Sequence, residues 1–172
     1  MRRRSVGRSE NPRTTTEPDS ARVRIPPPIL IVVCLVAGWS LDWGRSWLIL
    51  PATRWGAPRV ALSGALILLG LGLIGYCAWQ FKRAQTSIKP RRATSSIITN
   101  GPYRYSRNPI YLGFAITGIG IALAFNTYWM LLSVLAFVLI ANKLVIEREE
   151  KYLEGKFGES YLNYRREARR WL

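Results

Sequence analysis

Four hydrophobic stretches separated by polar segments set the pattern of this chain, and they lie at residues 29–41, 60–81, 109–125 and 128–146. The second stretch is the clearest, because it supplies about the 20 apolar residues that a helix needs to cross a bilayer. The first fits either a short membrane helix or the core of a signal peptide. We favour the helix, because no A-x-A cleavage pattern is evident and Trp39, Trp43 and Trp47 suit a helix that leaves the bilayer through its interface. The pattern predicts an all-α, polytopic membrane protein with about four transmembrane helices.

Small residues mark two of these stretches. The second carries four glycines with no strand before them, Gly64, Gly70, Gly72 and Gly75. We interpret them as points of close helix packing rather than as a phosphate-binding loop. The third carries a stripe of small residues at helical spacing, Gly113, Thr117, Gly120 and Ala124. We expect this stripe to let the third and fourth helices pack as a tight hairpin, joined at residues 126–127.

The formal net charge is +15, and 49% of the residues are hydrophobic. The basic and the apolar residues must therefore lie in separate segments of the chain, and they do. Residues 1–24 carry seven arginines and almost no apolar side chains, which predicts a disordered basic tail ahead of one membrane domain at residues 25–172. Those arginines are either solvated or in contact with anionic lipid. Residues 82–107 carry seven cations and no acids, which predicts a cytoplasmic loop. With four spans, both termini lie on that same side, and we expect the inner membrane of a bacterium.

Composition also narrows the chemistry. The chain has no histidine, which excludes histidine-ligated metal sites and the Ser-His-Asp and Cys-His nucleophile systems. Both cysteines, Cys34 and Cys77, lie in hydrophobic stretches, so we interpret them as small buried hydrophobes rather than as a disulfide or a reactive thiol. We expect neither a metal nor a nucleic acid as a partner.

Residues 99–113 read T-N-G-P-Y-R-Y-S-R-N-P-I-Y-L-G, a polar, aromatic and turn-rich segment between hydrophobic stretches. Asn108 suits a helix N-cap and Pro109 a first helical residue, so we predict that a helix begins here. A helix N-terminus attracts carboxylates and phosphates, and the same turn holds Tyr103, Tyr105, Tyr111, Arg104 and Arg107. The segment predicts a site for an anionic, ring-bearing ligand; the alternative is a basic loop with interfacial tyrosines.

The fourth helix is expected to continue past the membrane and to place Glu149 in the middle of an apolar face, among Val145, Ile146, Tyr152 and Leu153. A carboxylate in that position must find a cationic partner or take up a proton. Its partner is either a ligand or an internal arginine, namely Arg104, Arg107 or Arg165.

Two neighbouring acids differ from Glu149. Glu150 lies at the border of the apolar face and is a candidate second hydrogen-bonding carboxylate. Glu147 falls on the opposite face with Lys143 and Lys151, where i,i+4 pairing gives it an ordinary surface role. Residues 159–172 then predict a cytoplasmic C-terminal amphipathic helix, with tyrosines on one side and arginines for anionic lipid headgroups on the other.

The run G-P-Y-R-Y-S-R-N-P-I-Y-L-G, followed downstream by E-R-E-E-K-Y-L-E-G-K-F-G-E-S-Y-L-N-Y, resembles the isoprenylcysteine carboxyl methyltransferase family and its phospholipid methyltransferase relatives. The resemblance covers residues 94–172, with both blocks in order at family-like spacing. It implies an integral membrane enzyme that transfers a methyl group from S-adenosylmethionine to a lipophilic or small-thiol acceptor at the membrane surface. The implied partners are the lipid bilayer and that acceptor, with a cytoplasmic cofactor region at residues 94–111 and 147–172.

The resemblance also implies site residues. The positions that match cofactor contacts of the family are Ser95, Ser96, Ile97, Ile98, Tyr103, Asn108, Pro109, Ile110, Tyr111 and Glu149. We expect the turn at residues 108–111 to hold the amino acid end of the cofactor, Glu149 to bond its ammonium or ribose hydroxyls, and Tyr103 to border the adenosine. The candidate substrate contacts are Arg104, Arg107 and Arg148.

Two positions depart from the family pattern. Well-known relatives carry histidine where this chain has Asn108, and an arginine assigned to the substrate in the prenylcysteine enzymes aligns with Val145, which puts the prenylcysteine carboxylate in doubt as acceptor. Two other functions stay open. One is an NADPH-dependent membrane reductase of the sterol reductase type, which shares an R-x-P-x-Y pattern, and the other is a non-catalytic membrane protein that binds anionic lipid.

Overall fold

The computed structural model of this protein describes residues 26–42, 49, 52–83 and 97–172. The predicted basic tail and the candidate residues Ser95 and Ser96 lie outside these ranges. The elements are α1 (Pro27–Asp42), α2 (Ala52–Arg83), the 3-10 turn η1 (Gly101–Arg104), α3 (Pro109–Phe125), α4 (Tyr128–Ala141), the π-helical turn η2 (Asn142–Ile146), α5 (Glu147–Phe157) and α6 (Glu159–Glu167). The part of the chain that is described contains no strand; an isolated β-bridge joins Ser106 to Arg169, and most of the described residues are in helices and turns. The all-α prediction is confirmed.

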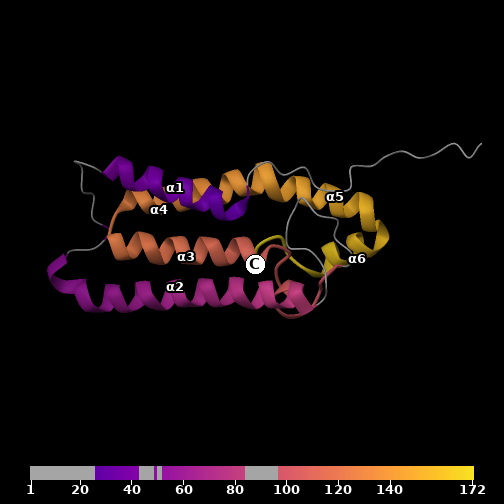
Figure 1. The fold of residues 1–172 in the computed structure, drawn as a ribbon, viewed down its shortest axis with the longest axis horizontal. Helices are drawn as coiled ribbons and strands as arrows, with labels where there is room; N and C mark the ends of the chain where they lie inside the picture. Colours follow the sequence, from indigo (N-terminus) through magenta and orange to yellow (C-terminus); the bar gives the residue numbers. More distant parts are fainter. Residues whose placement is uncertain (1–25, 43–48, 50–51, 84–96) are drawn as a thin grey trace, which may run out of the picture.

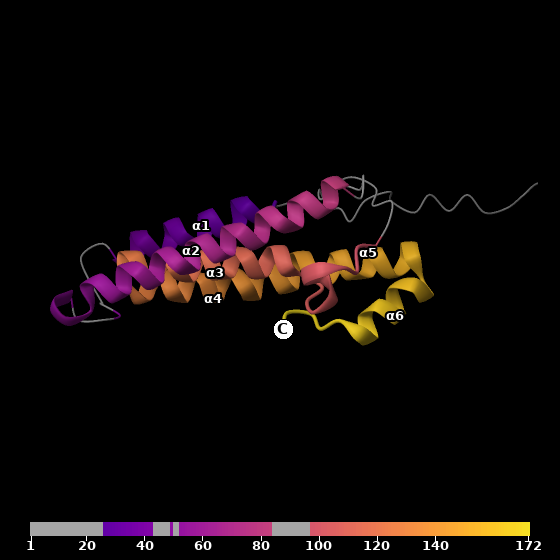
Figure 2. The same ribbon diagram turned by 90° about the horizontal axis from the view of Figure 1, so that it is seen from below.

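Helices α1 to α4 form an elongated bundle in which α3 lies between α2 and α4, and α1 packs along α4 (Figure 1). Helix α5 continues the line of α4 beyond the bundle, and α6 folds back from its far end. In the turned view, the residues after α6 return to the start of α3, where the chain ends (Figure 2). The segments that carry the predicted site therefore meet at one end of the bundle.

The closest helix contact is between α2 and α3. A Cβ added at Gly70 would lie 2.6 Å from the carbonyl oxygen of Gly113, and one added at Gly113 would lie 2.9 Å from that of Gly70. The predicted stripe of small residues on α3 therefore packs against α2, and the expectation that it packs against α4 is wrong. The physical reason is that α4 meets a different face of α3, where a Cβ on Gly118 would lie 2.8 Å from Val134. Of the four glycines in the second stretch, only Gly70 marks a close approach.

A short turn joins α3 to α4 at the predicted place. Asn126 ends α3 in the left-handed region, with φ of 57°, which asparagine tolerates better than most residues. Thr127 caps α4 by accepting a hydrogen bond from the Trp129 N–H at 3.3 Å, and its hydroxyl donates to Asp42 of α1 at 2.7 Å. Arg59 of α2 donates to the terminal carbonyl groups of α3. This end of the bundle is thus closed by local hydrogen bonds.

Two helical stretches are long and apolar enough to cross a membrane, Gly56–Arg83 and Tyr128–Phe157, and α1 and α3 are apolar but shorter. The apolar part of the second stretch ends at Ile146, because the α5 sequence that follows is E-R-E-E-K-Y-L-E-G-K-F. Leu68 and Leu69 of α2 are 73% and 60% exposed, as expected for side chains that face lipid. These features fit an integral membrane protein.

The fourth helix continues past its apolar part as predicted, but through a π-helical turn that the sequence did not indicate. The last helix is shorter than predicted. It ends at Glu167 because Ala168 adopts an extended conformation, with φ of −106° and ψ of 135°. The residues after it run beside Ser106 instead of continuing the helix.

Candidate functional site

The site is built around a hydrogen bond between α3 and α5. The hydroxyl of Tyr111 donates to Oε1 of Glu149 over 3.0 Å. Tyr111 is buried in the core cluster that also contains Val145 and Ile146, and Glu149 is half-buried. Two residues predicted to share a site, 38 positions apart in the sequence, are therefore in direct contact.

Burial changes the acidity of Glu149. It raises the pKa of the carboxyl from 4.5 to about 7, the hydrogen bond from Tyr111 opposes this shift, and the charge of Glu150 adds to it. The carboxyl lies in α5, beyond the apolar part of the helix. Among the described residues, no cation pairs with Glu149; Arg107 pairs with Glu150, and Arg165 pairs with Glu154. Glu149 therefore has the properties of a carboxylate that would bind a cation or hydroxyl groups supplied by a ligand.

Tyr103 lies beside this pair and is held from two sides. Its ring packs edge-on against Phe81 of α2, with ring centroids 5.7 Å apart, and its hydroxyl lies near the thiol of Cys77. Its carbonyl oxygen accepts a hydrogen bond from Tyr164 at 2.7 Å. Burial raises the pKa of Tyr103, and the charge of Glu149 acts in the same direction, so the two side chains are electrostatic neighbours. Cys77 is a buried free cysteine, as predicted. Its proximity to Tyr103 was not predicted.

The start of α3 and its N-cap position are as predicted, but the N-cap side chain does not bond to the helix. The helix begins at Pro109, which is fully buried, and Ile110 is half-buried. The side chain of Asn108 makes no capping hydrogen bond; its Nδ2 donates to the carbonyl oxygen of Arg170 at 2.9 Å. Asn108 is therefore the N-cap residue by position, as predicted, but its side chain does not cap the helix, because its amide is oriented toward the carbonyl group of the returning C-terminal segment.

Glu150 is the most buried acid of the candidate site, although the sequence pattern predicted that it lies only at the border of the apolar face. It is 7% exposed and pairs with Arg107 at 3.0 Å and with Arg170 at 2.6 Å. The reason is the π-helical turn η2, which adds about one residue to the helix and so turns the following acids by roughly 100°. Ile146 follows the buried Ala141 after five residues, and Glu150 follows Ile146 after four. Glu147 pairs with Lys143 on the opposite face at 3.5 Å, as predicted.

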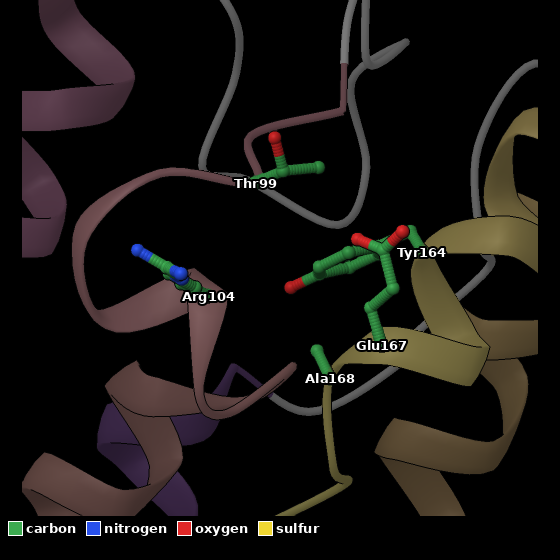
Figure 3. Close-up of a pocket in the computed structure, with 5 residues that line it drawn as sticks. All are labelled: Thr99, Arg104, Tyr164, Glu167 and Ala168. Atoms are coloured by element: carbon green, nitrogen blue, oxygen red, sulfur yellow. The ribbon is translucent and has the colours of Figure 1, made fainter.

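The candidate substrate contacts have different surroundings. The Arg107 side chain is 10% exposed and is committed to Glu150, whereas Arg104 and Arg148 are exposed. Arg104 lines a pocket of about 360 Å³ together with Thr99, Tyr164, Glu167 and Ala168. Figure 3 shows Arg104 and Thr99 on the η1 side of this pocket and the other residues on the α6 side. Its walls carry charges of opposite sign.

The remaining predicted residues lie at the edge of the site. Ile97 packs against a small cluster made of Tyr161, Tyr164 and Ala168, and Ile98 is half-buried. Within the described ranges, no group of three or more acids or cysteines is arranged to hold a metal ion.

Comparisons with known proteins relate the sequence of this chain to methyltransferases. The sequence model of the phospholipid methyltransferase family matches residues 58–160. An uncharacterized protein of Haemophilus influenzae is 51% identical over 41 residues, which cover 24% of this chain and 65% of that protein. The protein-S-isoprenylcysteine O-methyltransferase of Schizosaccharomyces pombe is 30% identical over 106 residues, which cover 54% of this chain and 44% of that enzyme. No solved structure matches significantly.

The chain spans less than two thirds of the length of either relative. The family match, in contrast, covers more than half of the chain and includes the η1 turn, the start of α3, and Glu149. This chain belongs to the phospholipid methyltransferase family.

Proposed function

We propose that this chain transfers a methyl group from S-adenosylmethionine to a lipophilic or small-thiol acceptor at the membrane surface. The observation that carries the proposal is the Tyr111–Glu149 pair at the end of the bundle, inside the region matched by the family. A membrane methyltransferase needs its cofactor site at the bilayer surface, and this pair lies just beyond the apolar part of α4 and η2.

The residues fit the cofactor by chemical type. Glu149 offers a carboxylate with no cationic partner among the described residues, which suits an ammonium group or ribose hydroxyls. The N-terminus of α3 suits a carboxylate through the N–H groups of Ile110 and Tyr111. The amide of Asn108 is engaged by Arg170, so this turn contributes through the helix terminus rather than through that side chain.

S-adenosylmethionine supplies an electrophilic methyl group on a sulfonium centre. The protein's share of the reaction is then to bind, align and exclude water, which requires no histidine. Glu149 holds the cationic or hydroxyl end in place, and Tyr111 fixes the carboxylate that does so. Tyr103 borders the ring system, and its own contacts with α2 keep that wall rigid.

The acceptor is proposed to enter between helices and to stop at the same surface. Arg104 is the candidate substrate contact whose surroundings leave room for this role, since it is exposed and lines the pocket that Glu167 also lines. The proposal places four spans in the bilayer, counts α1 and α3 among them, and puts both termini on the cytoplasmic side of a bacterial inner membrane.

Binding of labelled cofactor tests this function directly. Purified protein in detergent should retain radiolabelled S-adenosylmethionine and not NADPH, and Glu149→Gln should weaken cofactor binding at least tenfold, about 1.4 kcal/mol. Glu147→Gln is the matched control, because that acid lies on the opposite face with Lys143, and it should leave affinity unchanged. Retention of NADPH instead would favour a reductase, and equal binding by both variants would remove Glu149 from the site.

The acceptor requires a second experiment. Membranes that contain the protein are incubated with methyl-labelled cofactor, and lipid extracts and volatile products are then examined for label. We expect label in one such product, and none when the membranes carry the Glu149→Gln variant at the same low cofactor concentration. Unlabelled extracts, from protein that does bind the cofactor, would contradict a lipophilic acceptor.

A further inference from the structure

The residues after α6 form an extended segment along the turn that leads into α3, and we call residues 168–171 the C-terminal strap. The N–H of Arg107 donates to the carbonyl of Arg169 over 2.8 Å, and the N–H of Arg169 donates to the carbonyl of Tyr105 over 3.3 Å. The side chain of Asn108 donates to the next carbonyl of the strap, that of Arg170, at 2.9 Å. The strap thus pairs with polar groups of the turn that precedes helix α3.

A single buried carboxylate ties the strap to α5. Arg170 grips Glu150 with two nitrogens, Nη2 to Oε2 at 2.6 Å and Nε to Oε1 at 3.1 Å. Arg107, which belongs to the turn, reaches the same carboxylate at 3.0 Å. Glu150 therefore connects three segments that are far apart in the sequence. The bidentate pairing of the Arg170 guanidinium with both carboxylate oxygens fixes the orientation of the two side chains as well as the distance between them.

Apolar side chains hold the strap at both of its ends. Ala168 is 4% exposed and packs with Tyr161 and Tyr164 of α6, and Trp171 packs against the core cluster that contains Tyr111. The ion pair of Arg165 with Glu154 shows the contrast, because both of its side chains are almost half exposed and it holds no second segment.

The strap acts on both partners of the Tyr111–Glu149 hydrogen bond. Tyr111 stands three residues after Asn108, which the strap holds, and Glu149 is the sequence neighbour of Glu150, which the strap also holds. Two guanidinium groups also balance the charge of Glu150, which otherwise acts on Glu149. We propose that the C-terminal strap is a positioning element of the cofactor site and that Arg170 is its positioning residue. This inference rests on the proposed function.

Arg170→Met tests the proposal, because it removes the charge and keeps much of the side-chain length. Amide hydrogen exchange of the cofactor-free protein in detergent should accelerate at Arg107 and Arg169, the two N–H groups that pair strap and turn, by at least tenfold. The Kd for S-adenosylmethionine should rise about tenfold, and KM for the cofactor should rise more than kcat falls. Arg170→Lys keeps the charge without the fork and should show the same changes at a smaller size.

Arg166→Met is the matched control, since Arg166 is exposed on α6 and its side chain donates to Asn163 of the same helix, at 3.4 Å, rather than to the strap or the turn. It should change neither the amide exchange rates nor the affinity for S-adenosylmethionine.

Unchanged amide exchange in Arg170→Met would overturn the strap as a holding element, and faster exchange with an unchanged Kd would make its role merely structural. If Arg170→Met does not fold, Arg170→Lys decides, and a Kd within twofold of wild type overturns the inference. Failure of the wild-type protein to bind the cofactor would instead reject the proposed function, while the exchange result would still report on the strap.

Discussion

The two ends of the helix bundle solve different problems. At the α3–α4 end, Thr127 donates to Asp42 and accepts from the first turn of α4, and Arg59 donates to the last carbonyl groups of α3, around a turn of two residues. At the other end, the chain gathers η1, α5, α6 and the strap, and it buries carboxylates there. One of them, Glu149, meets a tyrosine hydroxyl instead of a cation. The difference indicates that closing a bundle takes few polar groups paired with one another, whereas the proposed ligand site would leave one charge to be completed from outside.

The largest expected effect separates the two acids of the site. Glu150→Ala should destabilise the protein by about 3 kcal/mol, because it leaves the buried Arg107 and the partly exposed Arg170 without their anion. Thermal unfolding in detergent measures this loss. Glu154→Ala removes an exposed pair with Arg165 and should cost less than about 0.5 kcal/mol. Equal shifts for the two variants would show that burial of Glu150 has no special importance.

A substitution at the α3–α4 end of the bundle should change the stability of the protein and leave cofactor affinity unchanged. Thr127→Val removes both the α4 cap and the hydrogen bond to Asp42, and it should cost about 2 kcal/mol. The affinity for S-adenosylmethionine, measured on the folded fraction, should stay at the wild-type value. Thr127→Ser retains the hydroxyl and should restore most of the stability. A change in cofactor affinity would contradict the separation of the two ends.

The pH dependence of binding gives a sharper test of Glu149. Burial raises the pKa of Glu149 from 4.5 to about 7. At a pH between these two values, this carboxyl binds more protons in the folded protein than in the unfolded one. Its contribution to the stability of the fold therefore decreases as the pH rises through this range. A cation needs the ionised form, so cofactor affinity should rise about tenfold between about pH 6 and about pH 8. The other groups that face this carboxyl are Tyr111, Tyr103 and Glu150, and two guanidinium groups pair with Glu150. Glu149→Gln should abolish this rise, and a rise that persists in the variant would assign it to another group.

The smallest effect on stability is expected at the exposed pair between η2 and α5. Lys143→Ala breaks the surface pair with Glu147 and should change stability by only about 0.3 kcal/mol, because the lysine side chain is 75% exposed. Thermal unfolding and cofactor binding should both match wild type within error. A tenfold loss of affinity would place this face of α5 in the site as well.

Sequence patterns were sufficient for the elements that depend on local preferences. Pro109 starts α3, residues 126–127 turn the chain, and Glu147 pairs with Lys143 as its spacing requires. Through the family resemblance and the apolar face, they also predicted that Tyr111 and Glu149 lie together, and the two side chains are in contact.

The features that were missed depend on contacts between distant segments. Nothing in the local sequence shows that Arg170 will return to Glu150, or that Asn108 will bond a C-terminal carbonyl instead of its own helix. The small-residue stripe on α3 has the correct chemistry for close packing, but its spacing does not say which neighbour it meets. The π-helical turn displaced the centre of the apolar face from Glu149 to Glu150 by one position.

That π-helical turn has a consequence for protein engineering. Because η2 holds one residue beyond a regular helical count, a deletion of one position within Asn142–Ile146 can be absorbed by converting the π-helical turn to a regular one, whereas a deletion of one position in the regular helix α4 would swing both acids of α5 away from their partners by roughly 100° while leaving every side chain of the site in the sequence. The geometry of the proposed site is therefore encoded partly in a length, and a shortened variant can lose it without losing any residue that touches a ligand.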